Sequence, residues 1–227
     1  MKLFLSGGGD EKKSEMLDRK FSEALDKSKP LLYIPIAIDT KRFPYPGCLD
    51  WIKSCLGKFN VKDIVMWTEE DLKKSKEQDF NCFSGVYIGG GNTFKLLKNL
   101  KEFGTFDILK KLIKEDIPVY GGSAGAIIMG KTILSASLSD PNIVNLREFS
   151  SFNLINEYEI WPHYKEQMDK DIFNYQNKKS SKVIALPEDS GLCVNDKEIL
   201  VVGRSSSFIF NQIKQEIKPG FFIPPIK

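Results

Sequence analysis

Histidine is almost absent from this sequence of 227 residues, in which His163 is the only one. Cysteine is scarce as well, and the four cysteines are scattered without a Cys-x-x-Cys pair. These shortages remove the patterns that support a zinc site or a disulfide framework. We therefore expect no metal ion and no disulfide, with the cysteines acting as small buried side chains in a reducing compartment.

Long apolar runs and blocks of a single charge are also missing. No run approaches the roughly 18 residues that span a bilayer, and residues 2–5 lack the pattern of a secretory signal. The net charge is +3, with lysines spread along the chain rather than gathered in a basic block. We expect a cytoplasmic protein that binds neither membrane nor nucleic acid and needs no cofactor. The sequence leaves open whether it is a monomer or a homodimer.

Short apolar runs alternate with helix-length segments over the first 130 residues. Strands are predicted at residues 3–6, 31–36, 61–67, 86–88 and 118–120. The spacing of apolar residues predicts helices at about 10–25, 51–59, 94–100, 106–114 and 126–129. Strands joined through helices indicate parallel pairing with helices on both faces. The expected fold is a three-layer, doubly wound α/β structure with a mostly parallel sheet.

The pattern changes after residue 135. Three apolar runs, at residues 183–186, 191–194 and 199–203, follow one another closely, and residues 195–196 supply a turn between the last two. We expect strand pairs or hairpins that form an antiparallel edge of the sheet. Because no linker or repeat interrupts the chain, we predict one α/β domain over residues 1–227.

The clearest motif is Gly-x-Ser-x-Gly at residues 121–125. Small residues two positions to either side of Ser123 permit a sharp turn between a strand and a helix. Such a turn projects the hydroxyl above the sheet and directs the next amide toward an oxyanion. The alternative is a serine that caps a helix within a turn of small residues. The predicted strand before the motif and the predicted helix after it favour the nucleophile.

Two further glycine-rich turns, at residues 7–9 and 89–91, follow predicted strands. Ligands of doubly wound sheets bind outside the carboxyl ends of the strands, where glycine lets the backbone approach closely. Neither turn has the Lys and Ser/Thr spacing of a P-loop. Three such turns on one rim favour a binding site over ordinary strand-to-helix connections.

A nucleophilic serine needs a general base, and His163 holds the only imidazole. A triad also needs an acid that orients the ring. Glu188 and Asp189 end an apolar strand, at a position from which a carboxylate can reach the rim. Asp140 lies between the serine and the histidine, in a Ser-Asp-Pro sequence typical of a loop. On the residues alone, the identity of the acid stays open.

At these motifs the sequence resembles peptidase family S51, the group of aspartyl dipeptidases (peptidase E) and cyanophycinases. The matching motifs occur in order across nearly the whole chain, as Ser-Gly-Gly-Gly at 6–9, Gly-Gly-Gly-Asn-Thr-Phe at 89–94, Gly-Gly-Ser-Ala-Gly-Ala at 121–126, Pro-His at 162–163 and Leu-Pro-Glu-Asp at 186–189. The resemblance implies a fold like that of class I glutamine amidotransferases. It also implies that Ser123 is the nucleophile, His163 the base and Glu188 the acid, with Asp140 as the alternative acid.

The resemblance extends to the oxyanion hole and the reaction. The backbone amides of Gly90 or Gly91, together with Ala124, would form the oxyanion hole. The implied activity is that of a serine-type exopeptidase or dipeptidase that hydrolyses short peptides through an acyl-enzyme. Another amidase or acyl hydrolase, or an inactive ligand-binding relative, is the alternative.

Aspartate-specific members of the family carry arginines after the histidine. In this chain residues 164–182 include lysines and no arginine, and lysine lacks the bidentate fork that grips a carboxylate. We therefore expect a small peptide as substrate, and a preference for an acidic N-terminal residue stays open.

Overall fold

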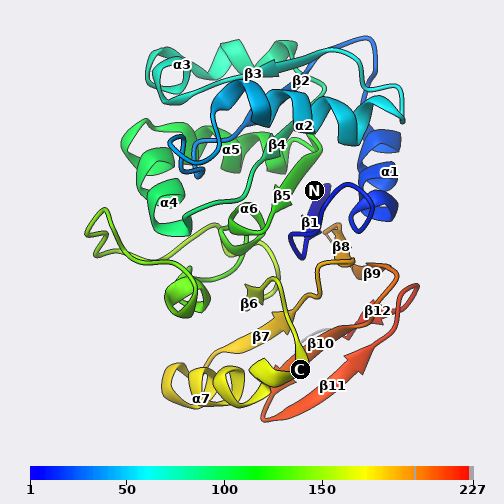
Figure 1. The fold of residues 1–227 in the computed structure, drawn as a ribbon, viewed down its shortest axis with the longest axis vertical. Coiled ribbons are helices and arrows are strands. Elements are labelled where there is room, and N and C mark those ends of the chain that lie inside the picture. The colour runs from blue at the N-terminus through cyan, green and yellow to red at the C-terminus, as the bar shows by residue number, and fades with distance from the viewer. Residues whose placement is uncertain (197, 225–227) are drawn as a thin grey trace.

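A computed structural model describes residues 1–196 and 198–224, which form an eight-stranded and a four-stranded sheet (Figure 1). The large sheet has the strand order β12-β9-β8-β1-β5-β4-β2-β3. Its strands are β1 (Leu3–Ser6), β2 (Leu31–Ile34), β3 (Ile64–Met66), β4 (Gly85–Ile88), β5 (Val119–Gly122), β8 (Ser190–Val194), β9 (Ile199–Gly203) and β12 (Phe222–Ile223). The small sheet has the order β11-β10-β7-β6 and consists of β6 (Tyr158–Trp161), β7 (Lys182–Ala185), β10 (Ser207–Asn211) and β11 (Ile213–Ile217).

Strands β1 to β5 pair in parallel, whereas β8, β9 and β12 add to the β1 side in antiparallel pairs. This arrangement confirms the predicted mostly parallel sheet with an antiparallel edge. The helices are α1 (Glu15–Ala24), α2 (Tyr45–Gly57), α3 (Glu69–Lys74), α4 (Thr93–Glu102), α5 (Thr105–Lys114), α6 (Ala124–Ile127) and α7 (Asp169–Lys179). In the described part of the chain, no helix combines the length and the apolar character that crossing a bilayer requires.

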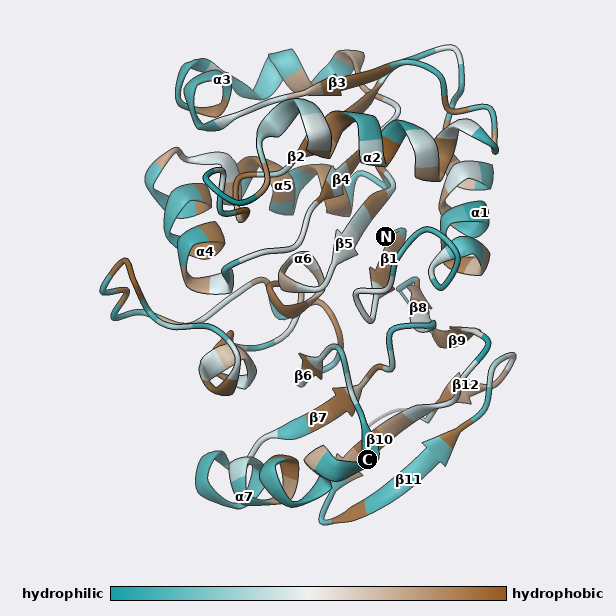
Figure 2. Cartoon of the chain, viewed as in Figure 1, coloured by the Kyte–Doolittle hydropathy of each residue, from teal (hydrophilic) through white to brown (hydrophobic). Residues whose placement is uncertain are grey.

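Side-chain alternation along the strands builds a core on each face of the large sheet. On one face, Phe4 packs in a cluster with Phe21 of α1 and Ile52 of α2. On the other face, Leu5 belongs to a cluster that includes Leu97 of α4 and residues of α5 and α6. Figure 2 shows brown stretches on several strands of the large sheet, whereas β5, which carries two glycines, is paler. These two helical layers confirm the predicted three-layer architecture.

The prediction for the run at 183–186 was wrong in one respect. This run forms β7, which pairs with β6 and β10 in the small sheet instead of joining the antiparallel edge of the large one. The chain leaves the small sheet at Pro187, which has no N–H to continue a ladder, and the Pro187 carbonyl accepts a hydrogen bond from Ser190 N at the start of β8. The three apolar runs between residues 183 and 203 are therefore divided between two sheets, with β7 in the small sheet and β8 and β9 in the large one.

The two sheets share one hydrophobic cluster, which contains Leu5 and Leu192 of the large sheet and Ile184 and Ile209 of the small sheet. Helix α7 covers the opposite face of the small sheet, where Ile172 packs with residues of β7 and β10. We propose, on the basis of this continuous core, that the sheets belong to one domain.

The starts of two helices differ most from the prediction, while α6 begins and ends two residues before its predicted range. Helix α1 begins at Glu15 and not near residue 10, because Asp10 organises a separate turn through hydrogen bonds from the amides of Lys12, Lys13 and Ser14. Helix α2 begins at Tyr45, six residues before the predicted start, with a proline in its first turn, where the missing N–H costs nothing.

Candidate active site

Ser123 occupies the junction between β5 and α6, in the strand–turn–helix context that the motif predicts. Its backbone has φ +50° and ψ −106°, a conformation that non-glycine residues rarely adopt. A Cβ atom at Gly121 would lie 2.3 Å from the carbonyl oxygen of Gly125, and one at Gly125 would lie 2.3 Å from that of Ile88. The turn therefore requires glycine at both positions.

His163 follows β6, and it also has a positive φ, of +53°. Its backbone amide donates a hydrogen bond to the Gly7 carbonyl at 2.8 Å, and the amide of Tyr164 donates to the Leu186 carbonyl at 3.0 Å. The ring lies directly over Gly8, where a Cβ would come within 2.4 Å of Cε1. These contacts hold Nε2 2.9 Å from the Ser123 hydroxyl oxygen. The glycine turn at 7–9 thus leaves room for the imidazole, and Gly8 and Gly9 also border a cavity together with Ser123.

Of the three candidate acids, Glu188 is the one that the structure brings to the imidazole. Glu188 Oε1 lies 3.1 Å from Nδ1 of His163. Asp189 accepts a hydrogen bond from the Ser205 hydroxyl at 2.9 Å. The Asp140 carboxylate accepts from the amide and the hydroxyl of Thr93, at 2.8 and 2.6 Å. Asp140 is thereby engaged at the first turn of α4.

Lys13 completes this line of polar groups. Its ammonium group lies 2.6 Å from Oε2 of Glu188. The hydrogen bond from Lys13, followed by the interaction with His163, holds the pKa of Glu188 below its ordinary value. Lys13 and Glu188 are 175 residues apart, and no local pattern marks Lys13 among the many lysines.

If Glu188 is the acid of the predicted triad, Lys13→Met should lower kcat about three- to tenfold with little change in KM, because Glu188 loses the contact that orients its carboxylate. Lys13→Arg should restore most of the activity. The lowered pKa of Glu188 makes its ionisation stabilising above its ordinary value of 4.5, and this contribution disappears as the pH falls through the lower folded-state pKa. Lys13→Met should therefore lower Tm more at pH 7 than at pH 3. An equal loss at both pH values would contradict this role.

The predicted oxyanion residues lie on two turns beside Ser123. The turn at 89–91 approaches Ser123 at Gly90, where a Cβ would lie 3.2 Å from that of Ser123. Its conformation is fixed on either side by backbone hydrogen bonds from Gly89 and Asn92. Gly91 borders a cavity together with Ser123. Ala124 is the first residue of α6, so its amide lies at the helix N-terminus.

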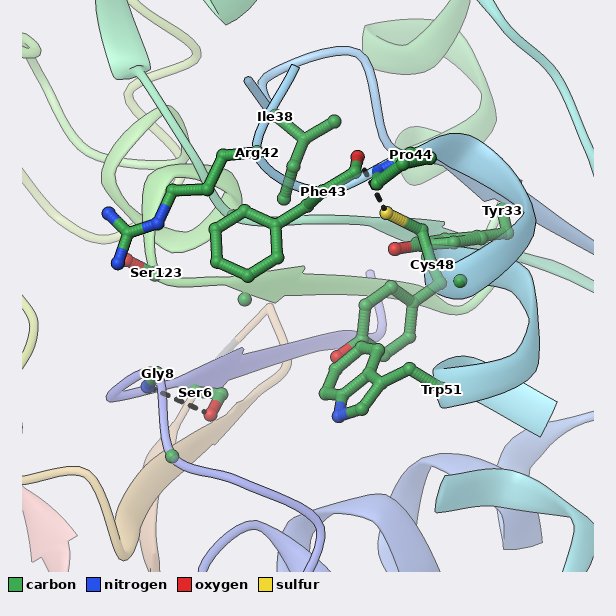
Figure 3. Close-up of a pocket in the computed structure, with 15 residues that line it drawn as sticks. Ser6, Gly8, Tyr33, Ile38, Arg42, Phe43, Pro44, Cys48, Trp51 and Ser123 are labelled. Carbon is green, nitrogen blue, oxygen red and sulfur yellow. Dashed lines mark hydrogen bonds between the residues drawn. The ribbon is translucent and has the colours of Figure 1, made fainter. Parts of the chain in front are cut away.

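Two cavities meet at Ser123. One, of about 450 Å³, has mainly apolar and aromatic walls (Figure 3). Gly90 and Gly122 also line this cavity. The other, of about 400 Å³, contains His163 and Trp161. Because Ser123 borders both cavities, one bound molecule could occupy both of them and pass over the serine. Across residues 1–196 and 198–224, no group of three or more His, Cys, Asp or Glu side chains is arranged to hold a metal ion.

Comparisons with known proteins agree with this fold. The chain is 24% identical over 204 residues to "Peptidase E" of Shewanella denitrificans, covering 81% of this chain and 83% of that protein. It is 28% identical over 207 residues to "Peptidase E" of a Nostoc species, covering 84% of this chain and 80% of that protein. The crystal structure of a peptidase from an acI-B1 actinobacterium matches with a TM-score of 0.69 at 19% identity, covering 98% of this chain and 96% of that one. The model of "Peptidase family S51" matches residues 3–202. The chain belongs to peptidase family S51.

Proposed function

We propose that this peptidase is a serine peptidase that hydrolyses short peptides through an acyl-enzyme. The observation that carries the proposal is the continuous polar line from Ser123 Oγ to His163 Nε2 at 2.9 Å and from Nδ1 to Glu188 at 3.1 Å. A hydroxyl, an imidazole and a carboxylate in this order form the constellation that activates a serine. The strained backbone at both Ser123 and His163 is typical of functional positions.

The proposed reaction has two halves. Ser123 Oγ attacks the scissile carbonyl carbon while its proton passes to Nε2 of His163, and Glu188 holds the Nδ1 proton and stabilises the imidazolium. The oxyanion forms beside the 89–91 turn and the amide of Ala124. When the carbon–nitrogen bond breaks, the amine leaves with the proton from Nε2. Water then repeats the sequence on the acyl-enzyme, releasing the acid and restoring the serine.

A fluorophosphonate probe tests this proposal directly, because it reacts with an activated serine. We expect intact-mass measurement to show one adduct, mapped by peptide sequencing to Ser123, and no adduct in Ser123→Ala. Ser28→Ala is the matched control, since Ser28 is an exposed turn residue bonded to Asp26, and it should label normally. A dipeptide library then separates peptide hydrolysis from hydrolysis of other amides or esters. A wild-type protein that fails to react with the probe would indicate a ligand-binding relative without catalysis.

A further inference from the structure

The larger of the two cavities at Ser123 has an aromatic wall that is already assembled. The Tyr87 ring lies edge-on to Tyr33, with 5.6 Å between ring centroids, and to Trp51, with 6.3 Å. Phe43 also borders the cavity, and Figure 3 shows its ring facing the space between Arg42 and Trp51. Phe43 and Trp51 remain 49% and 40% exposed. Large apolar rings at the mouth of a cavity favour a ligand that covers them.

Arg42 gives the same cavity a positive charge. The described residues that line this cavity include no carboxylate, and Arg42 is the single charged one among them. Unlike Arg204, which pairs with Glu15, Arg42 lies over the Phe43 ring, 5.1 Å from its centroid. Figure 3 shows its guanidinium extended toward the Ser123 side. A guanidinium in this position can bind a ligand carboxylate through two parallel hydrogen bonds.

The loop that carries Arg42 is held in place by its own hydrogen bonds. The Asp39 carbonyl accepts from the amides of Arg42 and Phe43, at 3.1 and 2.8 Å. The Cys48 thiol of α2 lies 3.7 Å from the Phe43 carbonyl. The guanidinium therefore extends from a fixed turn, which reduces the entropy that ligand binding would cost.

The second cavity has the opposite charge. Asp140 and Asp171 border it together with His163, and no lysine or arginine is among its described lining residues. A short peptide carries a positive α-amino group at one end and a negative α-carboxylate at the other. Charge complementarity therefore orients such a peptide across Ser123, with its amino end toward Asp140 and Asp171 and its carboxyl end toward Arg42.

We infer that the substrates are dipeptides whose carboxy-terminal residue has a large apolar or aromatic side chain. This residue occupies the aromatic cavity, its free carboxylate binds Arg42, and it departs as the amine when Ser123 is acylated. The inference rests on the proposed serine-peptidase function and adds the substrate class and the orientation. It assigns selectivity to the residue after the scissile bond.

The test compares kcat/KM of the wild-type protein for four compounds: Ala-Phe, Ala-Ala, Phe-Ala and the C-terminal amide of Ala-Phe. We expect kcat/KM for Ala-Phe to exceed that for Ala-Ala by about tenfold or more, because a substrate that lacks the apolar groups of a fitted pocket loses at least that factor. Loss of the carboxylate charge in the amide should cost about tenfold or more. Phe-Ala should gain nothing over Ala-Ala. A preference for Phe-Ala over Ala-Phe, or equal rates for the acid and the amide, would overturn the inference.

Arg42→Gln tests the guanidinium itself. The ratio of kcat/KM for Ala-Phe to that for its amide should fall toward one. Arg19→Gln is the matched control, because Arg19 is exposed and its guanidinium also lies over a ring, 5.4 Å from the centroid of Phe59. It should keep the wild-type ratio. An unchanged ratio in Arg42→Gln would overturn the inference.

Hydrolysis of p-nitrophenyl acetate by the wild-type protein and by Ser123→Ala separates a failure of the inferred dipeptide selectivity from a failure of the proposed serine chemistry. Ester hydrolysis that depends on Ser123, without any preference among the dipeptides, would overturn the inference and leave the serine chemistry intact. Loss of Ser123 dependence for every compound would overturn both.

Discussion

Ser123→Ala and His163→Ala are each expected to lower kcat by a similar factor, on the order of 10⁴ or more. The physical reason is that, in the proposed reaction, the two residues share one proton transfer across the 2.9 Å contact between Ser123 Oγ and His163 Nε2. Without the imidazole the hydroxyl is not activated, and without the hydroxyl the imidazole has no nucleophile to deprotonate. Steady-state kinetics on a dipeptide substrate measure the loss.

The double variant provides the sharper measurement. Because each single change already removes the shared step, Ser123→Ala/His163→Ala should be hardly slower than either single variant. Thermal unfolding should show that all three variants fold. Losses that multiply in the double variant would mean that the two residues act independently, and the proposed pair would be wrong.

The architecture around this pair could be predicted because its signals are local. Each parallel strand of the large sheet is a short apolar run followed by a glycine-rich turn or a helix, so type and order can be recognised without knowing the partner strand. The elbow is also local, since a Cβ atom at Gly121 would collide with Gly125, only four residues further along the chain. The sequence therefore indicates where a nucleophile would project.

The small sheet was harder to predict because its pairing is not local. Strand β7 pairs in parallel with β6, with the long helix α7 between them, and antiparallel with β10. An apolar run such as 183–186 has the same composition whichever sheet it joins. What decides its place is the break at Pro187 and the contacts of Leu186 with Trp161 and Tyr164, which involve residues more than twenty positions away.

Two charged residues of the site had no sequence signal for the same reason. Lys13 reaches Glu188 from the loop before α1, and Arg42 extends into the aromatic cavity from the loop before α2. Both lie in polar stretches where a solvated side chain is the ordinary expectation. Only the folded chain distinguishes them from the remaining lysines and arginines.

The second large loss of activity is expected for Glu188→Gln, because Glu188 is the proposed acid of the triad. This change should preserve the fold and lower kcat by roughly 10²- to 10⁴-fold, the scale on which a triad acid acts. A neutral amide can present its NH₂ group to Nδ1 of His163, which favours the wrong tautomer, and it cannot stabilise the imidazolium. The loss should appear in kcat more than in KM, because the imidazolium forms only during the reaction.

Asp140→Asn is the matched comparison, since it makes the same carboxylate-to-amide change in a residue that borders the same cavity as His163. The Asp140 carboxylate is engaged by the amide and the hydroxyl of Thr93, and an asparagine oxygen can accept both hydrogen bonds. The expected cost in stability is the lost charge at the start of α4, about 0.5 to 1 kcal/mol. Because Asp140 also borders the cavity inferred to take the amino end of a dipeptide, KM should rise, whereas kcat should fall much less than in Glu188→Gln. If Asp140→Asn were inactive while Glu188→Gln turned over normally, Asp140 would have to move from Thr93 to the imidazole in the reacting enzyme. The assignment of Glu188 would then be wrong, although the Ser123–His163 pair would stand.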